Sequence, residues 1–254
     1  MSHHRVEMNN VSYHYPDGNR GIRNVSMLLS HGESVGIIGA NGAGKSTLLM
    51  LILGILFPEE GEVLIGDIKV TAKTLSTIRQ RVGLVMQQAD DQLFMTTVYD
   101  DVAFGPRNEG LGEEAVAVRV SEALNTVGLS HLASRAPYKL SGGEKKSASI
   151  ATVLAMEPDI LLMDEPTAGL DPQARRRLIQ LLNCFQHTKI ITSHDLDMIM
   201  DTCSRVLVLQ DGVLVADGHP HDLLSSSEQM EAWGLELPLS MAKCPNCNTE
   251  KNCR

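Results

Sequence analysis

The chain has 254 residues, of which 43% are hydrophobic and 21% are charged. This length suffices for one large α/β domain or two small ones, and either would bury a substantial core. The 22 lysines and arginines stand against 31 aspartates and glutamates, a net charge of −9, and the basic residues form no long block. Because proteins hold nucleic acids by neutralising phosphates, this balance disfavours a nucleic-acid partner.

The hydrophobic segments do not predict insertion into a membrane. The longest near-continuous apolar run, Leu48 to Phe57, is about half of the roughly 20 residues that a bilayer-spanning helix needs. The N-terminus lacks the charged start, apolar stretch and cleavage site of a secretion signal. We therefore expect the protein to stay in the cytoplasm.

The first part of the chain predicts strands around one glycine-rich loop. Residues 5–15 and 25–38 show the patterns of antiparallel strands and then of a buried strand, which leads straight into the loop. Residues 45–56 predict a helix that ends before a proline. Residues 82–86 predict a short buried strand, and the polar run 87–92 breaks its pattern.

The rest of the chain predicts a helical insert and then a return to strands. From Thr97 to about Gly128 apolar residues recur with helical spacing, which departs from the β/α alternation around it. Ser141 is a typical N-cap of a further helix. Three β segments follow, the last a hairpin with an Asp-Gly turn: residues 160–163, 189–192 and 206–215. Beyond about residue 226 the pattern becomes irregular.

The glycine-rich loop has the pattern of a phosphate-binding loop between a buried strand and a helix. Its glycines let backbone amides converge on the β- and γ-phosphates of a nucleotide, and the helix N-terminus adds its positive end. Lys45 contributes a point charge, and the Ser46 hydroxyl can bind Mg²⁺. The predicted phosphate-binding residues are Gly39, Ala40, Asn41, Gly42, Ala43, Gly44, Lys45, Ser46 and Thr47.

Polar residues at three further strand ends fit the same chemistry. Asp164 ends an apolar strand, where the second metal-organising carboxylate of a P-loop ATPase belongs, and Glu165 can reach a water in line with the γ-phosphate. His194 follows another strand, at the sheet edge where ligands gather, and is a candidate γ-phosphate sensor. Gln87 can bring an amide oxygen to the metal or to the attacking water. Taken alone, an acidic pair or a histidine at a strand end is usually a solvated turn or a cap, but the phosphate-binding loop favours ATP and Mg²⁺ binding with Glu165 as the base.

Together with Leu140-Ser141-Gly142-Gly143-Glu144 and Ala168-Gly169-Leu170-Asp171, these motifs resemble the nucleotide-binding subunit of an ABC transporter over about residues 5–225. The resemblance implies an α/β fold with a P-loop NTPase (RecA-like) core, an antiparallel β subdomain and an α-helical subdomain. The implied domain covers residues 5–240, with the helical subdomain at about 88–158.

The same resemblance implies the roles of several residues outside the phosphate-binding loop. Tyr15 would stack on adenine, with Tyr13 as its competitor for that position. Ser141, Gly142 and Gly143 would grip the γ-phosphate held by the opposite subunit, and Asp171 would link the two sites. Because this chain carries both halves of such a site, the simplest assembly is a head-to-tail homodimer with two equivalent ATP sites.

A finer resemblance is to the energy-coupling-factor ATPases of the cobalt/nickel type called CbiO, and Asp90–Phe94, Thr97–Pro106 and Leu154–Pro158 carry it. It implies an ATPase at the cytoplasmic face of the cell membrane that powers uptake of cobalt or nickel ions. Its partners would be integral membrane subunits, a transmembrane coupling component and a substrate-binding component. The alternatives are a vitamin-type energy-coupling-factor ATPase, a soluble ABC ATPase in repair or translation, and a P-loop kinase, which would leave residues 140–144 without a role.

One residue of this chain departs from the usual pattern of the family, and we expect this residue to affect the rate of ATP turnover. Glu144 stands where Gln is commoner in the Ser-Gly-Gly motif, and it places one more negative charge near a bound anion. An exposed charge is screened by salt. We therefore expect slower turnover and a working enzyme.

Two groups of residues have a less settled role. Four apolar residues after Gln87 are candidates for the groove that receives cytoplasmic helices of a membrane partner, and packing inside the helical insert is an equal alternative: Leu93, Phe94, Val98 and Phe104. The tail 241–254 carries Cys244, Cys247 and Cys253, one thiol short of a closed zinc site, so a tail without metal is the favoured interpretation. Cys184 and Cys203 are expected to be buried free thiols.

Overall fold

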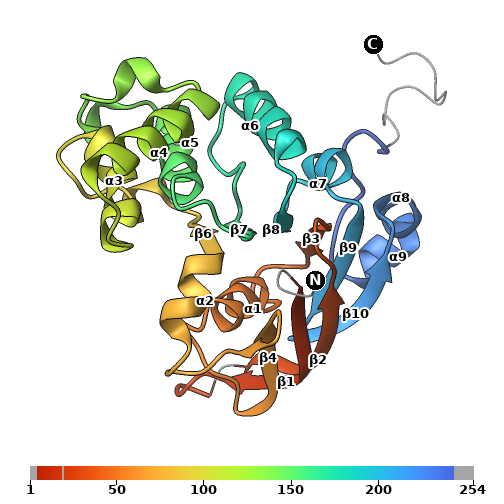
Figure 1. Cartoon of the computed structure of the whole chain (residues 1–254). Helices are drawn as coiled ribbons and strands as arrows, with labels where there is room; N and C mark the ends of the chain where they lie inside the picture. Colours follow the sequence, from red (N-terminus) through yellow and green to blue (C-terminus); the bar gives the residue numbers. More distant parts are fainter. Residues whose placement is uncertain (1–4, 19, 243–254) are drawn as a thin grey trace.

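The computed structural model describes residues 5–18 and 20–242 of the chain (Figure 1). The strands are β1 (Val6–His14), β2 (Arg20–Leu29), β3 (Ser34–Ile38), β4 (Glu60–Ile65), β5 (Ile68–Lys69), β6 (Val82–Val85), β7 (Ile160–Asp164), β8 (Thr188–Thr192), β9 (Arg205–Gln210) and β10 (Val213–Gly218). The helices are α1 (Lys45–Ile52), α2 (Leu75–Arg81), α3 (Val98–Asn108), α4 (Glu113–Thr126), α5 (Gly142–Leu154), α6 (Pro172–Cys184), α7 (Leu196–Thr202), α8 (Pro220–Leu224) and α9 (Ser227–Ala232). Short 3-10 turns lie at 89–91, 130–132 and 137–139.

The central feature is a six-stranded sheet in the order β10-β9-β3-β8-β7-β6. The pairs β9–β3, β3–β8, β8–β7 and β7–β6 are parallel, and only the β9–β10 hairpin is antiparallel. Every residue of β3 and β8 is buried, as expected for central strands with elements on both faces. The carboxyl ends of five parallel strands therefore meet at one edge of this sheet.

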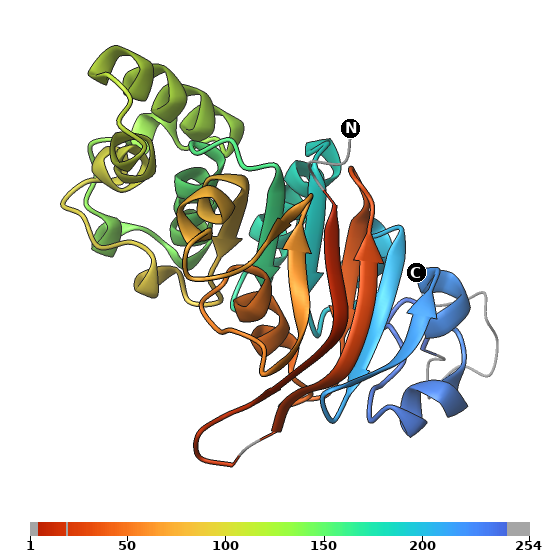
Figure 2. The ribbon, with the colours of Figure 1, turned by 60° about the horizontal axis from the view of Figure 1, so that its bottom comes forward.

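A second, antiparallel sheet in the order β2-β1-β4-β5 packs beside the first. Its strands run across the front of the molecule in Figure 2, next to the blue β9–β10 hairpin. Apolar side chains of β1, β2 and β4 share one core with α1 and with the inner strands of the large sheet. This common core holds the end of β3 and the start of α1 firmly in place.

The helices α3, α4 and α5 form a separate part of the molecule (Figure 1). They enclose their own apolar cluster, which includes Val102, Val116, Val120 and Ala148. The expectation of helices between Thr97 and Gly128 is confirmed, with Gly110 at φ +80° near the break between α3 and α4. The exact limits of the helical subdomain, predicted at about 88 and 158, stay a prediction.

The structure corrects three details of the sequence analysis. Helix α1 ends at Ile52 instead of continuing to residue 56, because Gly54 turns the chain at φ +68° and the Ile55 N–H bonds back to the Met50 carbonyl. Helix α9 forms after residue 226, where irregular structure was expected. Cys203 is a buried free thiol as expected, but Cys184 is exposed.

Within the described residues, no helix has both the length and the apolar character that crossing a bilayer requires. The residues Cys244, Cys247 and Cys253 lie outside the described part of the chain.

Candidate nucleotide-binding site

The loop between β3 and α1 forms the floor of a cleft of about 960 Å³. The loop turns tightly because Gly42 and Gly44 adopt positive φ angles of 78° and 103°. A Cβ atom on Gly39 would lie 2.2 Å from the Leu209 carbonyl oxygen, so the loop also needs glycine for close packing on β9. Residues 41–47 of the loop and of the first turn of α1 line this cleft. The N-terminus of α1 therefore lies at the candidate phosphate site, where its positive end favours an anion.

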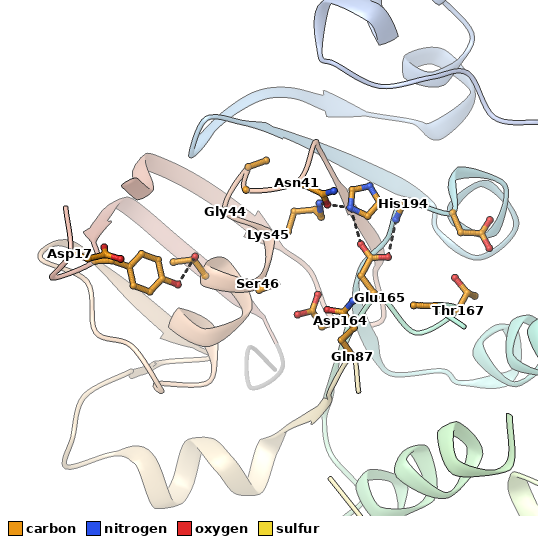
Figure 3. Close-up of a pocket in the computed structure, with 16 residues that line it drawn as sticks. Asp17, Asn41, Gly44, Lys45, Ser46, Gln87, Asp164, Glu165, Thr167 and His194 are labelled. Atoms are coloured by element: carbon orange, nitrogen blue, oxygen red, sulfur yellow. Dashed lines mark hydrogen bonds and ion pairs between the residues drawn. The ribbon is translucent and has the colours of Figure 1, made fainter. Parts of the chain in front are cut away.

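Sixteen residues line the cleft, and they come from both halves of the chain (Figure 3). They are Tyr15, Asp17, Asn41, Gly42, Ala43, Gly44, Lys45, Ser46, Thr47, Gln87, Asp164, Glu165, Thr167, Ala168, His194 and Asp195. Gln87 follows β6, Asp164 ends β7 and His194 follows β8. The parallel sheet therefore brings the predicted strand-end residues to the phosphate-binding loop, which is the arrangement expected at a carboxyl edge.

Lys45 is 8% exposed and is held by the residues around it. Its Nζ donates to the carbonyl oxygens of Gly39 at 2.8 Å and Ala40 at 3.2 Å, and lies 3.2 Å from His194 Nε2. Burial lowers the pKa of Lys45, while the carboxylates of Glu165 and Asp164 act in the opposite direction. A phosphate in the cleft would offer this cation a stronger partner than neutral carbonyls do.

Glu165 is fixed in an unusual backbone conformation, with φ at +45°. Its N–H donates to the Thr192 carbonyl at 3.0 Å, and its Oε2 accepts the His194 N–H at 3.0 Å. Its Oε1 is buried and has no hydrogen-bond partner within residues 5–18 and 20–242, although His194 Nε2 lies 3.5 Å away. A buried carboxylate oxygen without a partner is available to accept a hydrogen bond from water.

Oxygen-bearing side chains gather beside Glu165 in the same cleft. Ser46, Gln87 and Asp164 all line it (Figure 3), and Thr192 Oγ1 hydrogen-bonds to Asp164 Oδ1 and so orients the carboxylate. A hydroxyl, an amide and a carboxylate are the hard oxygen donors that suit Mg²⁺. The donor set therefore fits the predicted metal.

Of the two candidate tyrosines, the structure places Tyr15 in the cleft and Tyr13 against the core. The Tyr15 hydroxyl lies 2.9 Å from Thr47 Oγ1, at the first turn of α1. The ring edge of one tyrosine meets the face of the other at 5.2 Å and 86°. Tyr13 therefore supports Tyr15 from the core side.

The Ser-Gly-Gly motif and Asp171 do not line the cleft. Ser141, Gly142 and Asp171 are exposed at the first residues of α5 and α6. A Cβ on Gly143 would lie 2.9 Å from Ala174 Cβ, so these two helix starts touch each other in one subunit. Within a single chain, then, the predicted γ-phosphate grip lies outside the site that it would serve.

Glu144 closes a capping box at the start of α5. Its Oε2 accepts the Ser141 N–H at 2.7 Å, and Ser141 Oγ accepts the Glu144 N–H at 3.3 Å. The hydrogen bonds from Ser141 lower the pKa of Glu144. Ser141 therefore contributes both its N–H and its hydroxyl to this box within its own subunit.

The cleft lining also includes residues that the sequence did not assign to the site: Asp17, Thr167 and Asp195, together with Ala168, which was named only as part of a motif. Thr167, Ala168 and Asp195 adjoin predicted motif residues, which was the signal that could have found them. Asp195 N-caps α7 and is paired with Arg175 of α6, whose Nη2 lies 2.8 Å from Asp195 Oδ1. Burial alone would raise the pKa of Asp195, but its hydrogen bonds from Arg175 and the Met198 N–H hold that pKa below its usual value.

Replacing Gly44 by Ala is expected to remove nucleotide binding and to destabilise the fold by about 2 kcal/mol or more. The new Cβ would lie 2.6 Å from the Gly21 carbonyl oxygen, at a φ of +103°. Gly110→Ala is the matched control, because Gly110 has φ +80° with nothing within 4 Å of the added Cβ. Thermal unfolding and binding of a fluorescent ATP analogue measure both effects, and equal losses in the two variants would contradict the close-approach argument.

Comparison with known proteins places this site in a family. A family model described as ABC transporter matches residues 22–168. A protein of Geobacter sulfurreducens classed as an ABC transporter ATP-binding protein is 54% identical over 247 residues, which cover 97% of this chain and 99% of that protein. The energy-coupling factor transporter ATP-binding protein EcfA of Methanothermobacter thermautotrophicus is 46% identical over 238 residues, covering 92% of this chain and 76% of that protein.

Solved structures share the fold as well as the sequence. CbiO1 of Clostridium perfringens, part of the ABC transporter complex CbiONQ, has a TM-score of 0.80 and 36% identity, covering 89% of this chain and 93% of that chain. A dimeric ATP-binding cassette in a post-hydrolysis state, bound to ADP and Pi, has a TM-score of 0.77 and 30% identity, covering 85% of this chain and 98% of that chain. The predicted fold, a RecA-like P-loop core with antiparallel β and α-helical subdomains, is confirmed. By its sequence, its fold and the residues of its cleft, the chain belongs to the ABC transporter family, as an ATP-binding and ATP-hydrolysing subunit.

Proposed function

We propose that this chain is the ATPase of an energy-coupling-factor importer for cobalt or nickel ions and acts as a homodimer with shared ATP sites. The observation that carries the shared site is the position of Ser141 and Gly142, exposed on α5 and outside the cleft of their own subunit. The similarity to CbiO1 and EcfA supports the energy-coupling-factor type. The metal-ion substrate rests on the motif resemblance to CbiO.

Each site would take its parts from two subunits. One subunit supplies the phosphate-binding loop, Gln87, Glu165 and His194, and Tyr15 stacks on the adenine. The other supplies Ser141 at the start of α5, with Gly142 and Gly143 beside it. Asp171 links the two sites across the interface. The dimeric cassette among the structural neighbours supports such an assembly.

Hydrolysis would open the dimer that ATP closes. Glu165 takes a proton from the water that attacks the γ-phosphate, and His194 and Lys45 hold the phosphate oxygens. Ser46, Gln87 and Asp164 hold Mg²⁺, which when bound neutralises charge on the β- and γ-phosphates. Loss of the γ-phosphate removes the charge that Ser141–Gly143 grip, so the two subunits separate.

Two rival functions fit the charge and the motifs of this chain less well. A soluble ABC ATPase of repair or translation typically has a coiled-coil insertion, a second cassette or a basic surface, whereas this chain has a net charge of −9. A P-loop kinase has no use for the Ser-Gly-Gly motif. A vitamin importer of the same type would use the same motor, because another subunit selects the substrate.

The surface for the membrane partner is narrower than the sequence suggested. Leu93 and Val98 are buried in the helical cluster, so for these two residues the alternative of packing inside the helical insert holds. Phe94 and Phe104 are 63% and 40% exposed, and their rings meet edge to face at 5.0 Å. An exposed aromatic pair beside the segment after Gln87 is suited to receive a cytoplasmic helix of a membrane subunit.

Phe94→Glu is expected to abolish capture of the membrane subunits in a detergent pull-down while leaving the basal ATPase rate unchanged. The charge would have to be buried when the partner helix covers the aromatic pair. Val118→Glu is the matched control, because Val118 is 55% exposed on α4 of the same helical part. Equal capture by Phe94→Glu and wild type would contradict this docking surface.

Copurification from native membranes tests the function itself. We expect integral membrane subunits to copurify, and the reconstituted complex to take up cobalt or nickel ions only with hydrolysable ATP. Uptake of a vitamin in place of metal ions would support the alternative, a vitamin-type energy-coupling-factor ATPase. Absence of any membrane subunit, with binding to ribosomes or DNA, would support the soluble alternative. The expected location is the cytoplasmic face of the cell membrane, as a peripheral subunit.

A further inference from the structure

A buried lysine joins the two parts of the molecule next to the nucleotide cleft. Lys146 lies on α5, the helix whose N-cap is Ser141, and is 4% exposed. Its Nζ donates to the carbonyl oxygens of Met86 at 3.0 Å and of Gln87 at 2.8 Å. These two carbonyls belong to the segment that leaves β6 at the edge of the cleft. Lys146 therefore bonds the carbonyl groups immediately before and immediately after the α-carbon of Gln87.

The same segment is tied to α5 by a second side chain. Gln92 Oε1 accepts the Met86 N–H at 3.0 Å, while its Nε2 donates to the Ser149 carbonyl at 2.8 Å and to Thr152 Oγ1 at 2.7 Å. Met86 is thus held through both its N–H and its carbonyl. The backbone that presents Gln87 is bonded to α5 rather than left as a free loop.

Burying the Lys146 ammonium costs desolvation free energy, which argues that its contact with the two carbonyls has a function. Burial lowers the pKa of Lys146 to about 8, and the carboxylates of Asp164 and Glu165 act in the opposite direction. A buried cation bonded to neutral carbonyls gains less than one paired with a carboxylate. An apolar side chain of similar length would fill the same space without desolvating a charge.

We infer that Lys146 is a positioning residue that makes Gln87 move with α5, so that the grip of Ser141–Gly143 on the partner's nucleotide sets the position of Gln87 in its own site. The inference rests on the proposed function, in which Ser141 serves the opposite subunit and Gln87 serves its own. A shift of α5 caused by the nucleotide in one ATP site would then move Gln87 in the other ATP site. By linkage, the two sites would bind ATP cooperatively.

A purely structural Lys146 would act differently. It would satisfy the two carbonyls and contribute to stability, and its loss would lower the melting temperature without changing the relation between the two sites. The chain offers a matched example in Lys189, which is 6% exposed and donates its Nζ to the carbonyls of Leu182 at 2.6 Å and Phe185 at 2.9 Å. Those carbonyls close α6 and do not touch the cleft.

The experiment compares Lys146→Met with Lys189→Met in the full chain. ATPase rates are measured against ATP and against Mg²⁺, together with thermal unfolding. For Lys146→Met we expect the Hill coefficient for ATP to fall toward 1 and the Mg²⁺ concentration for half-maximal rate to rise about tenfold. For Lys189→Met we expect a loss of stability with both kinetic parameters unchanged.

The outcomes separate this inference from the proposed function. If Lys146→Met is folded and keeps the wild-type Hill coefficient and Mg²⁺ dependence, the inference is overturned. If Lys146→Met does not fold, Lys146→Gln decides, because its amide retains one donor to the carbonyls and should give an intermediate shift in both parameters; wild-type values would overturn the inference. The variants Gln87→Ala and Ser141→Asp test the proposed roles of these two residues separately. Only unchanged ATPase kinetics in these variants would remove the proposed function on which the inference rests.

Discussion

Replacing Glu165 by Gln is expected to lower the ATPase rate on the order of 10²–10⁴-fold and to accumulate a closed, ATP-bound dimer. Glu165 Oε1 is buried without a hydrogen-bond partner among the described residues, and Oε2 accepts the His194 N–H at 3.0 Å. Gln keeps the size of the side chain and an oxygen for the His194 N–H. It does not accept a proton from water, so binding and closure should proceed while hydrolysis stops.

Steady-state ATPase assays give the rate, and small-angle scattering with and without ATP gives the state of the dimer. The double variant Glu165→Gln, Ser141→Asp serves as the control, because it should bind ATP and remain monomeric. An unchanged rate in Glu165→Gln would refute the assignment of the base. Separate subunits in ATP, both alone and beside the membrane subunits, would refute the nucleotide-closed dimer.

Ser141→Asp is expected to abolish hydrolysis while leaving ATP binding to the monomer unchanged. Asp is as good an N-cap as Ser, and its charge suits a helix N-terminus, so α5 should stay intact. The same charge would face the γ-phosphate held by the partner and repel it. Binding to the monomer should be unaffected because Ser141 does not line the cleft of its own subunit.

Mixing two inactive variants gives the sharper test of sharing between subunits. A heterodimer of Ser141→Asp with Lys45→Ala has one site with an intact Lys45 and an intact Ser141 from different chains, and one site with neither. If dimers form at random, half of the dimers in an equal mixture carry one complete site of two. The mixture should then recover up to about a quarter of the wild-type rate, and less if the two sites cooperate as inferred for Lys146. No recovery in a mixture shown to contain heterodimers, or loss of ATP binding by the Ser141→Asp monomer, would argue against sites shared in this way.

The chemistry of the cleft was predictable because each contribution is a short motif at the end of a buried strand. The loop from Gly39, the pair Asp164 and Glu165, and His194 could each be placed at a strand end from local patterns. Parallel strands bring their carboxyl ends to one edge, so local patterns sufficed to predict that these residues meet. The structure places Asp164, Glu165, His194 and loop residues 41–47 in one cleft, whereas the predicted residues Gly39 and Ala40 do not line it.

Element boundaries and surface exposure were less predictable, since both depend on contacts between distant segments. Helix α1 ends at Ile52 because Gly54 turns the chain, although the apolar run continues beyond it. Leu93 and Phe94 are neighbours of similar hydrophobicity, yet packing against the helical cluster buries the first and exposes the second. The resemblance favoured Tyr15 over Tyr13 for the adenine position, and the structure places Tyr15 in the cleft.

Lys146 shows most clearly which contacts could not be predicted from the sequence. In the sequence it is one of two adjacent lysines after the Ser-Gly-Gly motif, and nothing local distinguishes it from Lys145. In the structure, Lys145 pairs with Asp90 at the surface, whereas Lys146 is buried on two carbonyls of the β6 end. Helical rotation points adjacent residues in different directions, so the partner of each depends on what packs against α5.

By itself, the sequence determined the family and the fold class, and it predicted most of the residues that line the cleft, because motif spacing and strand patterns are local properties of the chain. Only the tertiary structure decided which side chains on the helical part are exposed and that the backbone of Gln87 is bonded to the helix whose N-cap is Ser141. These properties depend on how segments from β6 and α5, about 60 residues apart, pack together.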